Sequence, residues 1–203
     1  MTTPTTAFCF DLDGVVTSQE LLPLIAEELG CYEEMKALTD ATIKGIVPFE
    51  SSFRLRCRIL SEVPISCVRQ IASQVHLHRR IVSFLHAHPD NAFIITGNLD
   101  VWIADLLREL HVGCYSSIGT ADGDKLTGVQ KVLNKGDAVQ LLRQRFDRIV
   151  AVGDGMGDVN MFEKVDVRIA FGAVHPPIES LVQLSDFLCF SEEALCQTLS
   201  TLS

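Results

Sequence analysis

The stretch Ala7-Phe8-Cys9-Phe10-Asp11-Leu12-Asp13-Gly14 decides how we expect the chain to fold. An unbroken apolar run of this length is typical of a strand that is buried on both faces, and an acidic turn containing a glycine follows it at once. In an open parallel sheet, ligands bind beyond the carboxyl ends of the strands, which is where such a turn must lie. The stretch therefore predicts a central strand that carries two carboxylates, Asp11 and Asp13, into a binding site.

Similar apolar runs recur along the chain, and most of them precede a stretch with helical periodicity. The predicted strands are Ala7–Phe10, Ala92–Ile95, Arg148–Val152, Val167–Phe171 and Phe187–Phe190. The helices predicted after them are Asp100–Leu110, Lys135–Gln144, Asn160–Lys164, Pro177–Leu184 and Glu192–Leu199. Strand-then-helix alternation predicts an α/β fold, a doubly wound parallel sheet with helices on both faces. Between Ser116 and Leu133, the Asp122-Gly123 pair favours a hairpin.

A segment of about 80 residues separates the first two predicted strands, far more than a single crossover requires. It has helical periodicity throughout, with glycine after two helix ends and proline at two helix starts. The predicted helices are Leu21–Leu29, Glu33–Lys44, Pro48–Leu60 and Pro64–Gln74. We therefore expect an α/β core formed by residues 1–17 and 76–203, with a small helical cap domain inserted at residues 18–75.

The composition is that of a globular chain without a membrane or nucleic-acid partner. Hydrophobic residues make up 47% of the 203 residues, enough for one well-packed core with a small inserted lobe. A formal net charge of −9 gives little support for binding nucleic acid, and no run approaches the roughly 20 apolar residues that cross a bilayer. Thr2–Thr6 do not resemble a secretory signal, and seven scattered cysteines lack a C-x-x-C pair. We expect a cytoplasmic monomer or homodimer.

A second acidic motif, Gly153-Asp154-Gly155-Met156-Gly157-Asp158, directly follows another apolar strand. Alone, it would most simply be a glycine-rich turn whose aspartates cap the next helix. Beside the first motif it brings Asp154 close to Asp11, and like charges held together in this way are costly unless a cation or a shifted pKa relieves their repulsion. Mg²⁺ prefers oxygen ligands, so the two motifs predict a magnesium site, in which Asp158 either binds the metal through a water molecule or orients the metal ligands.

Two further positions could hold a phosphoryl group. Thr96-Gly97-Asn98 ends a predicted strand and offers a hydroxyl and backbone N–H groups. Lys135 begins a predicted helix and brings a positive charge. Taken alone, the first is a routine turn and the second a solvated lysine. Together with the acidic motifs, these two positions predict a site that binds a phosphate group.

The order Asp-x-Asp, Thr, Lys and Gly-Asp-x-x-x-Asp resembles the haloacid dehalogenase-like hydrolases over nearly the whole chain. The chain is similar in particular to the phosphoserine phosphatase branch, whose helical cap follows the first motif. The resemblance implies a Mg²⁺-dependent phosphatase of serine biosynthesis, with Asp11 as nucleophile and Asp13 as general acid and base. It also implies metal ligation by Asp11, Asp13 through its backbone carbonyl, and Asp154. A small phosphorylated metabolite would be the substrate, L-phosphoserine being the first expected.

The resemblance further implies that residues of the cap bind the leaving group. Glu20 and Arg56 match the residues that hold the ammonium and the carboxylate of serine, and Phe49 matches an apolar residue above that site. The residues alone support simpler roles. Arg56 borders the apolar stripe of an amphipathic helix and could extend to solvent, and Glu20 could stabilise a helix start.

The substrate is left open by three departures from the phosphoserine phosphatase pattern, namely Gly14, Asn98 and Gly157. Phosphohomoserine, a sugar phosphate, or phosphotransfer to an acceptor other than water are alternatives. A signalling receiver domain, a different class, is also doubly wound with acidic residues, a threonine and a lysine at its strand ends. The helical insertion and the Asp11/Asp13 pair argue against it. The complete phosphate-binding set argues against an inactive binding module.

Overall fold

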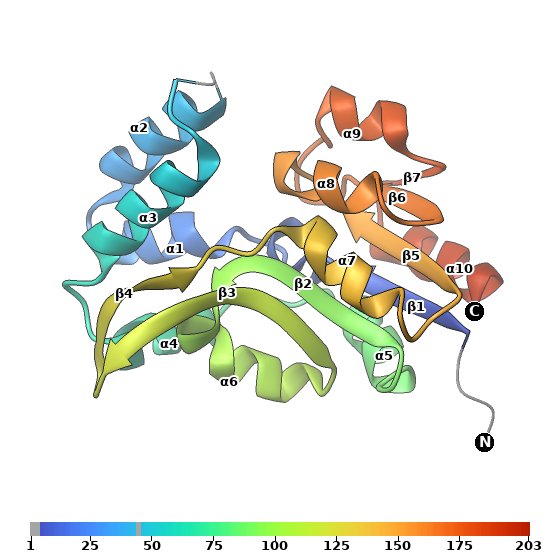
Figure 1. The fold of residues 1–203 in the computed structure, drawn as a ribbon, viewed down its shortest axis with the longest axis horizontal. Coiled ribbons are helices and arrows are strands. Elements are labelled where there is room, and N and C mark those ends of the chain that lie inside the picture. Colours follow the sequence, from blue (N-terminus) through green and yellow to red (C-terminus); the bar gives the residue numbers. More distant parts are fainter. Residues whose placement is uncertain (1–4, 44–45) are drawn as a thin grey trace.

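A seven-stranded sheet organises the part of the chain that the computed structural model describes, residues 5–43 and 46–203 (Figure 1). The strands are β1 (Thr6–Phe10), β2 (Ala92–Leu99), β3 (Gly113–Asp122), β4 (Lys125–Lys131), β5 (Arg148–Gly153), β6 (Val167–Phe171) and β7 (Phe187–Cys189). They lie in the order β4-β3-β2-β1-β5-β6-β7, and every neighbouring pair is parallel except the β3–β4 hairpin. The predicted α/β fold with a mainly parallel sheet is confirmed.

Helices cover both faces of this sheet. One face carries α5 (Arg79–Ala87), α6 (Asp100–Leu110) and α10 (Glu192–Leu202), and the other carries α7 (Lys135–Leu142), α8 (Val159–Phe162) and α9 (Glu179–Leu184). Along β1, Phe8 and Phe10 pack into the first of these two cores, and Ala7 and Cys9 into the second. Burial on both faces explains why the strand is apolar throughout instead of alternating. Within the described ranges, no helix combines the length and apolar character needed to cross a bilayer.

Between the turn that follows β1 and helix α5, the described residues form four α-helices. They are α1 (Leu21–Glu28), α2 (Tyr32–Ile43), α3 (Phe49–Leu60) and α4 (Ile65–Ala72). The chain enters and leaves this segment side by side, since Thr17 forms an antiparallel bridge with Leu77 and the Ser18 amide donates to the His76 carbonyl at 2.8 Å. In Figure 1, α2 lies away from the sheet, whereas α3 contacts the edge strand β4 and α4 packs against α6.

The structure differs from the sequence-based expectation in a few elements. The helix α5 was not among the helices named from the sequence, because its N-cap, His78, forms no side-chain cap hydrogen bond and no start signal precedes Arg79, although Pro89 follows its C-cap, His88. The predicted hairpin exists, with Gly123 at a φ of 58°, but β3 also pairs with β2 and so extends the main sheet. Lys44 and Gly45, where we expected the second helix to end, lie outside the described residues.

Candidate active site

The first acidic turn lies at the carboxyl end of β1, in the middle of the sheet. The Asp11 amide still donates to the Val152 carbonyl of β5, at 3.0 Å, and the chain then coils in a single wide turn over Leu12–Val16. Gly14 lies within this turn with a φ of 70°, a left-handed conformation that glycine adopts without strain. The turn keeps the side chain of Asp11 at the strand end, where it is 8% exposed.

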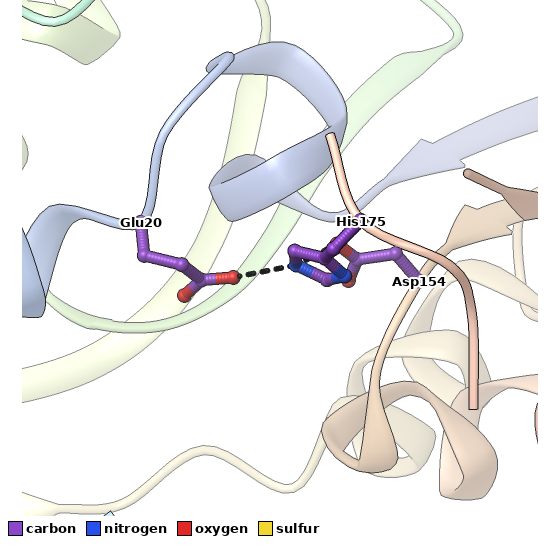
Figure 2. A group of neighbouring side chains, drawn as sticks. All are labelled: Glu20, Asp154 and His175. Carbon is purple, nitrogen blue, oxygen red and sulfur yellow. Dashed lines mark hydrogen bonds and ion pairs between the residues drawn. The ribbon is translucent and has the colours of Figure 1, made fainter. Parts of the chain in front are cut away.

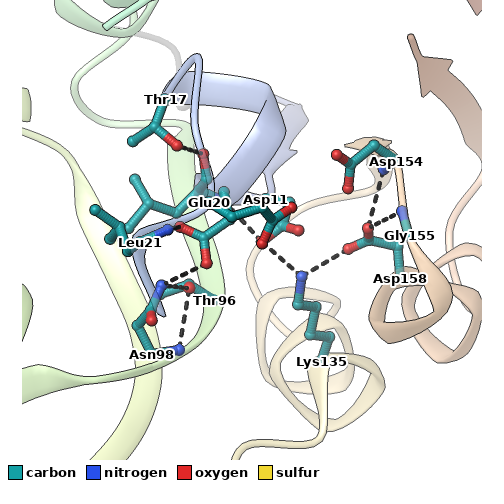
Figure 3. Close-up of polar contacts among 12 residues, drawn as sticks. Asp11, Thr17, Glu20, Leu21, Thr96, Asn98, Lys135, Asp154, Gly155 and Asp158 are labelled. Carbon is teal, nitrogen blue, oxygen red and sulfur yellow. Dashed lines mark hydrogen bonds and ion pairs between the residues drawn. The ribbon is translucent and has the colours of Figure 1, made fainter. Parts of the chain in front are cut away.

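Lys135, the first residue of α7, joins the two acidic motifs. Its Nζ lies 2.6 Å from Oδ1 of Asp11 and 2.7 Å from Oδ1 of Asp158 (Figure 3). All three side chains are buried, so the ion pairs are shielded from water and need good geometry to offset the cost of desolvation. Asn134 caps α7 through a hydrogen bond that its Oδ1 accepts from the Gly136 amide at 2.9 Å. This cap fixes the start of α7 and with it the position of Lys135.

Asp158 stabilises the turn of the second acidic motif. Its Oδ2 accepts hydrogen bonds from the backbone amides of Asp154 and Gly155, at 3.0 and 3.1 Å. Both oxygens of Asp158 are therefore engaged. Oδ2 of Asp154 is buried and accepts no hydrogen bond from the residues that the structure describes. A buried, unsatisfied carboxylate oxygen is costly, and a cation is one way to satisfy it.

The charge balance of this cluster also favours a cation. Ligand atoms of Asp11, Asp154 and Asp158 lie within 4.8 Å of one another. Burial, followed by the charge of Asp158, raises the pKa of Asp154 to about 7, and the same two causes raise the pKa of Asp11 well above its ordinary value. Burial works to lower the pKa of Lys135, but the charges of Asp11 and Asp158 outweigh it and raise the pKa. Lys135, which pairs with Asp11 and Asp158, and His175, whose Nε2 lies 3.1 Å from Oδ2 of Asp154, face these three carboxylates, so the set keeps an excess of acidic groups and an oxygen-preferring divalent ion fits it.

Asp13 points away from this cluster toward β2. Its Oδ2 accepts a hydrogen bond from Nδ2 of Asn98 at 3.0 Å, and its Oδ1 accepts one from the Leu21 amide at 3.3 Å. Burial, and next the charge of Glu20, raises the pKa of Asp13 to about 7. Oγ1 of Thr96 accepts from the Asn98 amide nitrogen Nδ2 at 3.1 Å (Figure 3). The structure thus gives Asn98 a contact that sequence reasoning had not assigned.

Sequence reasoning also missed His175, in the loop between β6 and α9. Its Nε2 lies 3.2 Å from Oε1 of Glu20 and 3.1 Å from Oδ2 of Asp154 (Figure 2). The hydrogen bond with Glu20 raises the pKa of His175 to about 9, so the imidazole is positively charged at neutral pH. The available signal was its position, because His175 follows a parallel strand as the other site residues do.

The remaining residues expected to bind substrate come from α3. Phe49 is 48% exposed, and its Cζ lies 4.0 Å from the point that a Cβ on Gly97 would occupy. Nε of Arg56 is buried and has no hydrogen-bond partner among the described residues. Arg56 lines a cavity of about 110 Å³ together with residues of α1 and α2. A larger groove of about 650 Å³ lies between α3 and β4, and none of the predicted site residues lines it.

Two of the three sequence departures have a structural explanation. A Cβ on Gly14 would lie 2.1 Å from Oδ2 of Asp154, so no larger residue fits without moving that carboxylate. Asn98 supplies the hydrogen bond to Asp13. At Gly157 a Cβ would meet no atom nearer than Cε of Lys135, at 3.9 Å, so there is room for a side chain and nothing in the structure explains the glycine.

Comparison with known proteins places this geometry in a family. The family model of haloacid dehalogenase-like hydrolases matches residues 8–163, which include both acidic motifs and Lys135. The chain belongs to this family. Of the site residues described above, only His175 lies beyond the matched range.

Curated relatives of this hydrolase include several phosphoserine phosphatases. The phosphoserine phosphatase of Methanocaldococcus jannaschii is 27% identical over 177 residues, covering 81% of this chain and 84% of that protein. The phosphoserine phosphatase of Lactococcus lactis subsp. lactis is 24% identical over 185 residues, covering 85% of each. The prediction of a phosphoserine phosphatase-like hydrolase is confirmed, and these names support a phosphatase.

Solved structures show that the fold is shared along the whole chain. A hydrolase of the same family from Salmonella enterica serovar Typhi has a TM-score of 0.84 at 21% identity, covering 95% of this chain and 71% of that one. A substrate-bound phosphoserine phosphatase has a TM-score of 0.80 at 23% identity, covering 99% of both chains. At identities of 21% and 23%, these two structures show that the fold is shared.

Proposed function

We propose that this hydrolase is a Mg²⁺-dependent phosphomonoesterase that acts on a small metabolite through an aspartyl-phosphate on Asp11, with L-phosphoserine as its first expected substrate. The observation that carries the proposal is the contact of Lys135 with Asp11 at 2.6 Å, beside the unsatisfied Oδ2 of Asp154. A buried carboxylate next to a fixed positive charge, at the carboxyl ends of parallel strands, suits attack on a bound phosphate.

In the first step, a carboxylate oxygen of Asp11 attacks phosphorus as the bond from phosphorus to the ester oxygen breaks. Lys135, the hydroxyl of Thr96 and the amide of Gly97 bind the oxygens of the phosphoryl group as charge moves across it. Thr96 and Lys135 are buried, at 1% and 8% exposed, which strengthens such contacts. Bound by Asp11, Asp154 and the backbone carbonyl of Asp13, Mg²⁺ would offset the repulsion between the carboxylate and the phosphate dianion.

Asp13 serves both steps in this proposal. With a pKa raised to about 7, it can hold a proton near neutral pH, pass it to the departing ester oxygen, and then accept a proton from the water that hydrolyses the aspartyl-phosphate. The hydrogen bonds from Asn98 and the Leu21 amide fix the orientation of its carboxyl group. The products are the free alcohol and inorganic phosphate.

We further propose that residues 18–75 form a cap domain on a core of residues 1–17 and 76–203. The contacts of Thr17 and Ser18 with Leu77 and His76 support this division, because the two segments that connect core and cap run side by side at the proposed boundary. The approach of Phe49 to Gly97 brings α3 over the end of β2. A cap in this position would exclude water and hold the leaving group.

The proposal is tested by measuring phosphate release with Mg²⁺ over a panel of esters. The panel contains L-phosphoserine, phosphothreonine, phosphohomoserine, several sugar phosphates and p-nitrophenyl phosphate. We expect hydrolysis, with the highest kcat/KM for L-phosphoserine. A higher value for another ester would leave the phosphatase in place and reassign its substrate. If no ester is hydrolysed while Asp11 becomes stably phosphorylated, a receiver-like function replaces the proposal.

Arg56→Ala is expected to raise the KM for L-phosphoserine by about 10- to 100-fold, since a hydrogen bond to a charged group contributes roughly 1.5–3 kcal/mol. The KM for p-nitrophenyl phosphate, which has no carboxylate, should change much less. Steady-state kinetics on both esters checks this, with Arg58→Ala on the exposed side of α3 as the matched control. Equal losses on the two esters would count against a carboxylate-binding role for Arg56.

Asp154→Asn is expected to stabilise the metal-free protein at pH 8. The pKa of Asp154 is about 7 in the folded protein against an ordinary 3.8, so folding binds a proton and stability falls as pH rises between these values. The asparagine removes this cost above pH 7 and makes little difference below pH 4. Thermal melts in EDTA at pH 8 and below pH 4 measure the difference in stability between Asp154→Asn and the unmodified protein.

Melts repeated with Mg²⁺ in place of EDTA test the metal site. At a Mg²⁺ concentration about 100-fold above Kd, binding stabilises the folded state by roughly 2.7 kcal/mol, which corresponds to about 5–10 °C in Tm for a chain of this size. We expect this increase for the unmodified protein and a much smaller one for Asp154→Asn. An equal increase in both would show that Asp154 is not a ligand.

A further inference from the structure

Two histidines from neighbouring helices lie close together at some distance along the fold from the acidic cluster. His86 is in the last turn of α5, and His111 directly follows α6. The centroids of their rings are 5.7 Å apart, and the ring planes are inclined at 57° to each other. Both residues are exposed, so a dissolved ion can reach them.

The topology places this pair at the opposite edge of the sheet from the candidate active site. α5 and α6 cover the same face of the sheet, and they end shortly before β2 and β3 begin (Figure 1). These two strands are parallel, with Phe93 of β2 paired to Gly113 of β3, so the histidines lie at the amino ends of the strands. Asp11 and Asp154 follow the carboxyl ends of β1 and β5. An ion bound by the histidines would therefore not contact the acidic cluster.

A hydrogen bond prepares the ring of His86 to bind a metal. Its Nε2 lies 3.0 Å from the carbonyl oxygen of Glu109, and because a carbonyl oxygen only accepts, Nε2 is the donor. In a neutral ring the lone pair is then on Nδ1. Histidines that bind metals almost always donate their other ring nitrogen to a backbone carbonyl, a carboxylate or water in this way. The contact with Glu109 thus fixes both the orientation of the ring and the nitrogen that is free to bind.

The backbone of His111 is a second unusual feature of this pair. Its φ is 53°, and among the described residues no other residue except glycine has a positive φ. Glycine takes this left-handed conformation at a helix end without the steric cost that a side chain brings. Non-glycine residues in such conformations cluster at functional sites. The side chain of His111 lies at the carboxyl end of α6, where the helix dipole favours a positive ion.

We infer that His86 and His111 together bind a transition-metal ion of the Zn²⁺ class, at a site separate from the proposed Mg²⁺ site. Imidazole nitrogen suits Zn²⁺, Cu²⁺ and Ni²⁺, whereas Mg²⁺ prefers oxygen ligands. Two rings that bind one ion at about 2.0–2.1 Å have centroids about 5–6 Å apart, and the observed separation is 5.7 Å. Water completes the coordination, and the ion links the ends of α5 and α6. The inference does not depend on the proposed phosphatase function.

Calorimetric titration with Zn²⁺ tests the site, in the presence of excess Mg²⁺ to occupy the acidic cluster. We expect the unmodified protein to bind Zn²⁺ at this site, and His86→Ala or His111→Gly to weaken that binding by about 10-fold or more, since even the loss of an outer contact costs 10- to 100-fold. His111→Gly removes the ring and leaves a residue that suits the left-handed backbone, so the fold is retained. His76→Ala, at another exposed histidine, is the matched control and should leave the affinity unchanged.

A spectroscopic measurement identifies the ligands directly. With one equivalent of Cu²⁺, the electron paramagnetic resonance spectrum should show two imidazole nitrogens in the unmodified protein and a single one in each variant. Equal affinity for Zn²⁺ in both variants and the unmodified protein overturns the inference, because the ion is then bound elsewhere. Absence of Zn²⁺ binding in the unmodified protein also overturns it. A lower Tm for His86→Ala with no change in affinity would show that His86 only caps the carboxyl end of α6, and this too overturns the inference.

Discussion

Asp11→Asn is expected to lower kcat for every phosphate ester by about 10⁴-fold or more, because removal of a covalent nucleophile eliminates the reaction path and leaves only binding and charge stabilisation. The substitution is close to isosteric. Oδ1 of Asp11 accepts from the Leu12 amide at 2.7 Å and lies 2.6 Å from Nζ of Lys135, and an amide oxygen can keep both contacts. Phosphate release over the ester panel measures the loss.

The fold has to survive for this result to be informative. We expect Asp11→Asn to match or exceed the Tm of the unmodified metal-free protein at pH 8, because it removes a buried charge whose pKa is raised by burial. Asp90→Asn, in the exposed turn before β2, is the control for the same chemical change. Residual activity above about 1% with an intact fold would mean that another group attacks phosphorus.

The parts of the site that local sequence determines could be predicted. Asp11, Thr96 and Asp154 each follow an apolar run, and parallel strands bring such positions to one edge of a sheet whatever lies between them. Lys135 depended on the other motifs for its interpretation, and its contacts with Asp11 and Asp158 support that interpretation. Strand prediction was therefore enough to bring Asp11, Thr96 and Asp154 to one edge of the sheet, whereas Lys135, at a helix start, needed the other motifs as well.

The contacts that local sequence does not determine could not be predicted. His175 and Glu20 are separated by 155 positions, and nothing near either of them signals the other. Asn98 was noted as part of the Thr96-Gly97-Asn98 motif and as a departure from a pattern, whereas its contact with Asp13 depends on the exact path of the turn after β1 beside the end of β2. The reason for a glycine at position 14 becomes clear only when Asp154 is placed beside it in the structure. Specificity depends on such contacts, which is why the reaction class is easier to predict than the substrate.

Asp13→Asn is expected to lower kcat for L-phosphoserine by about 10³-fold, within the range that general acid–base catalysis contributes. The loss should depend on the leaving group. An alkoxide needs a proton as it departs, whereas p-nitrophenolate leaves readily without one, so formation of the aspartyl-phosphate from p-nitrophenyl phosphate should be reduced far less. Rapid-mixing measurements of the first turnover on both esters check this difference.

The second step should be slowed for both esters, because the asparagine cannot accept a proton from the attacking water. With p-nitrophenyl phosphate, fast formation and slow hydrolysis of the aspartyl-phosphate then produce a burst of about one equivalent of p-nitrophenol per protein, with the phosphate still bound to Asp11. Mass measurement of the quenched protein detects that adduct. Without Asp11 no burst can form, so the double variant with Asp11→Asn is the control. Equal losses on both esters without a burst would show that Asp13 positions the site and transfers no proton, since only a proton-transfer role makes the loss depend on the leaving group.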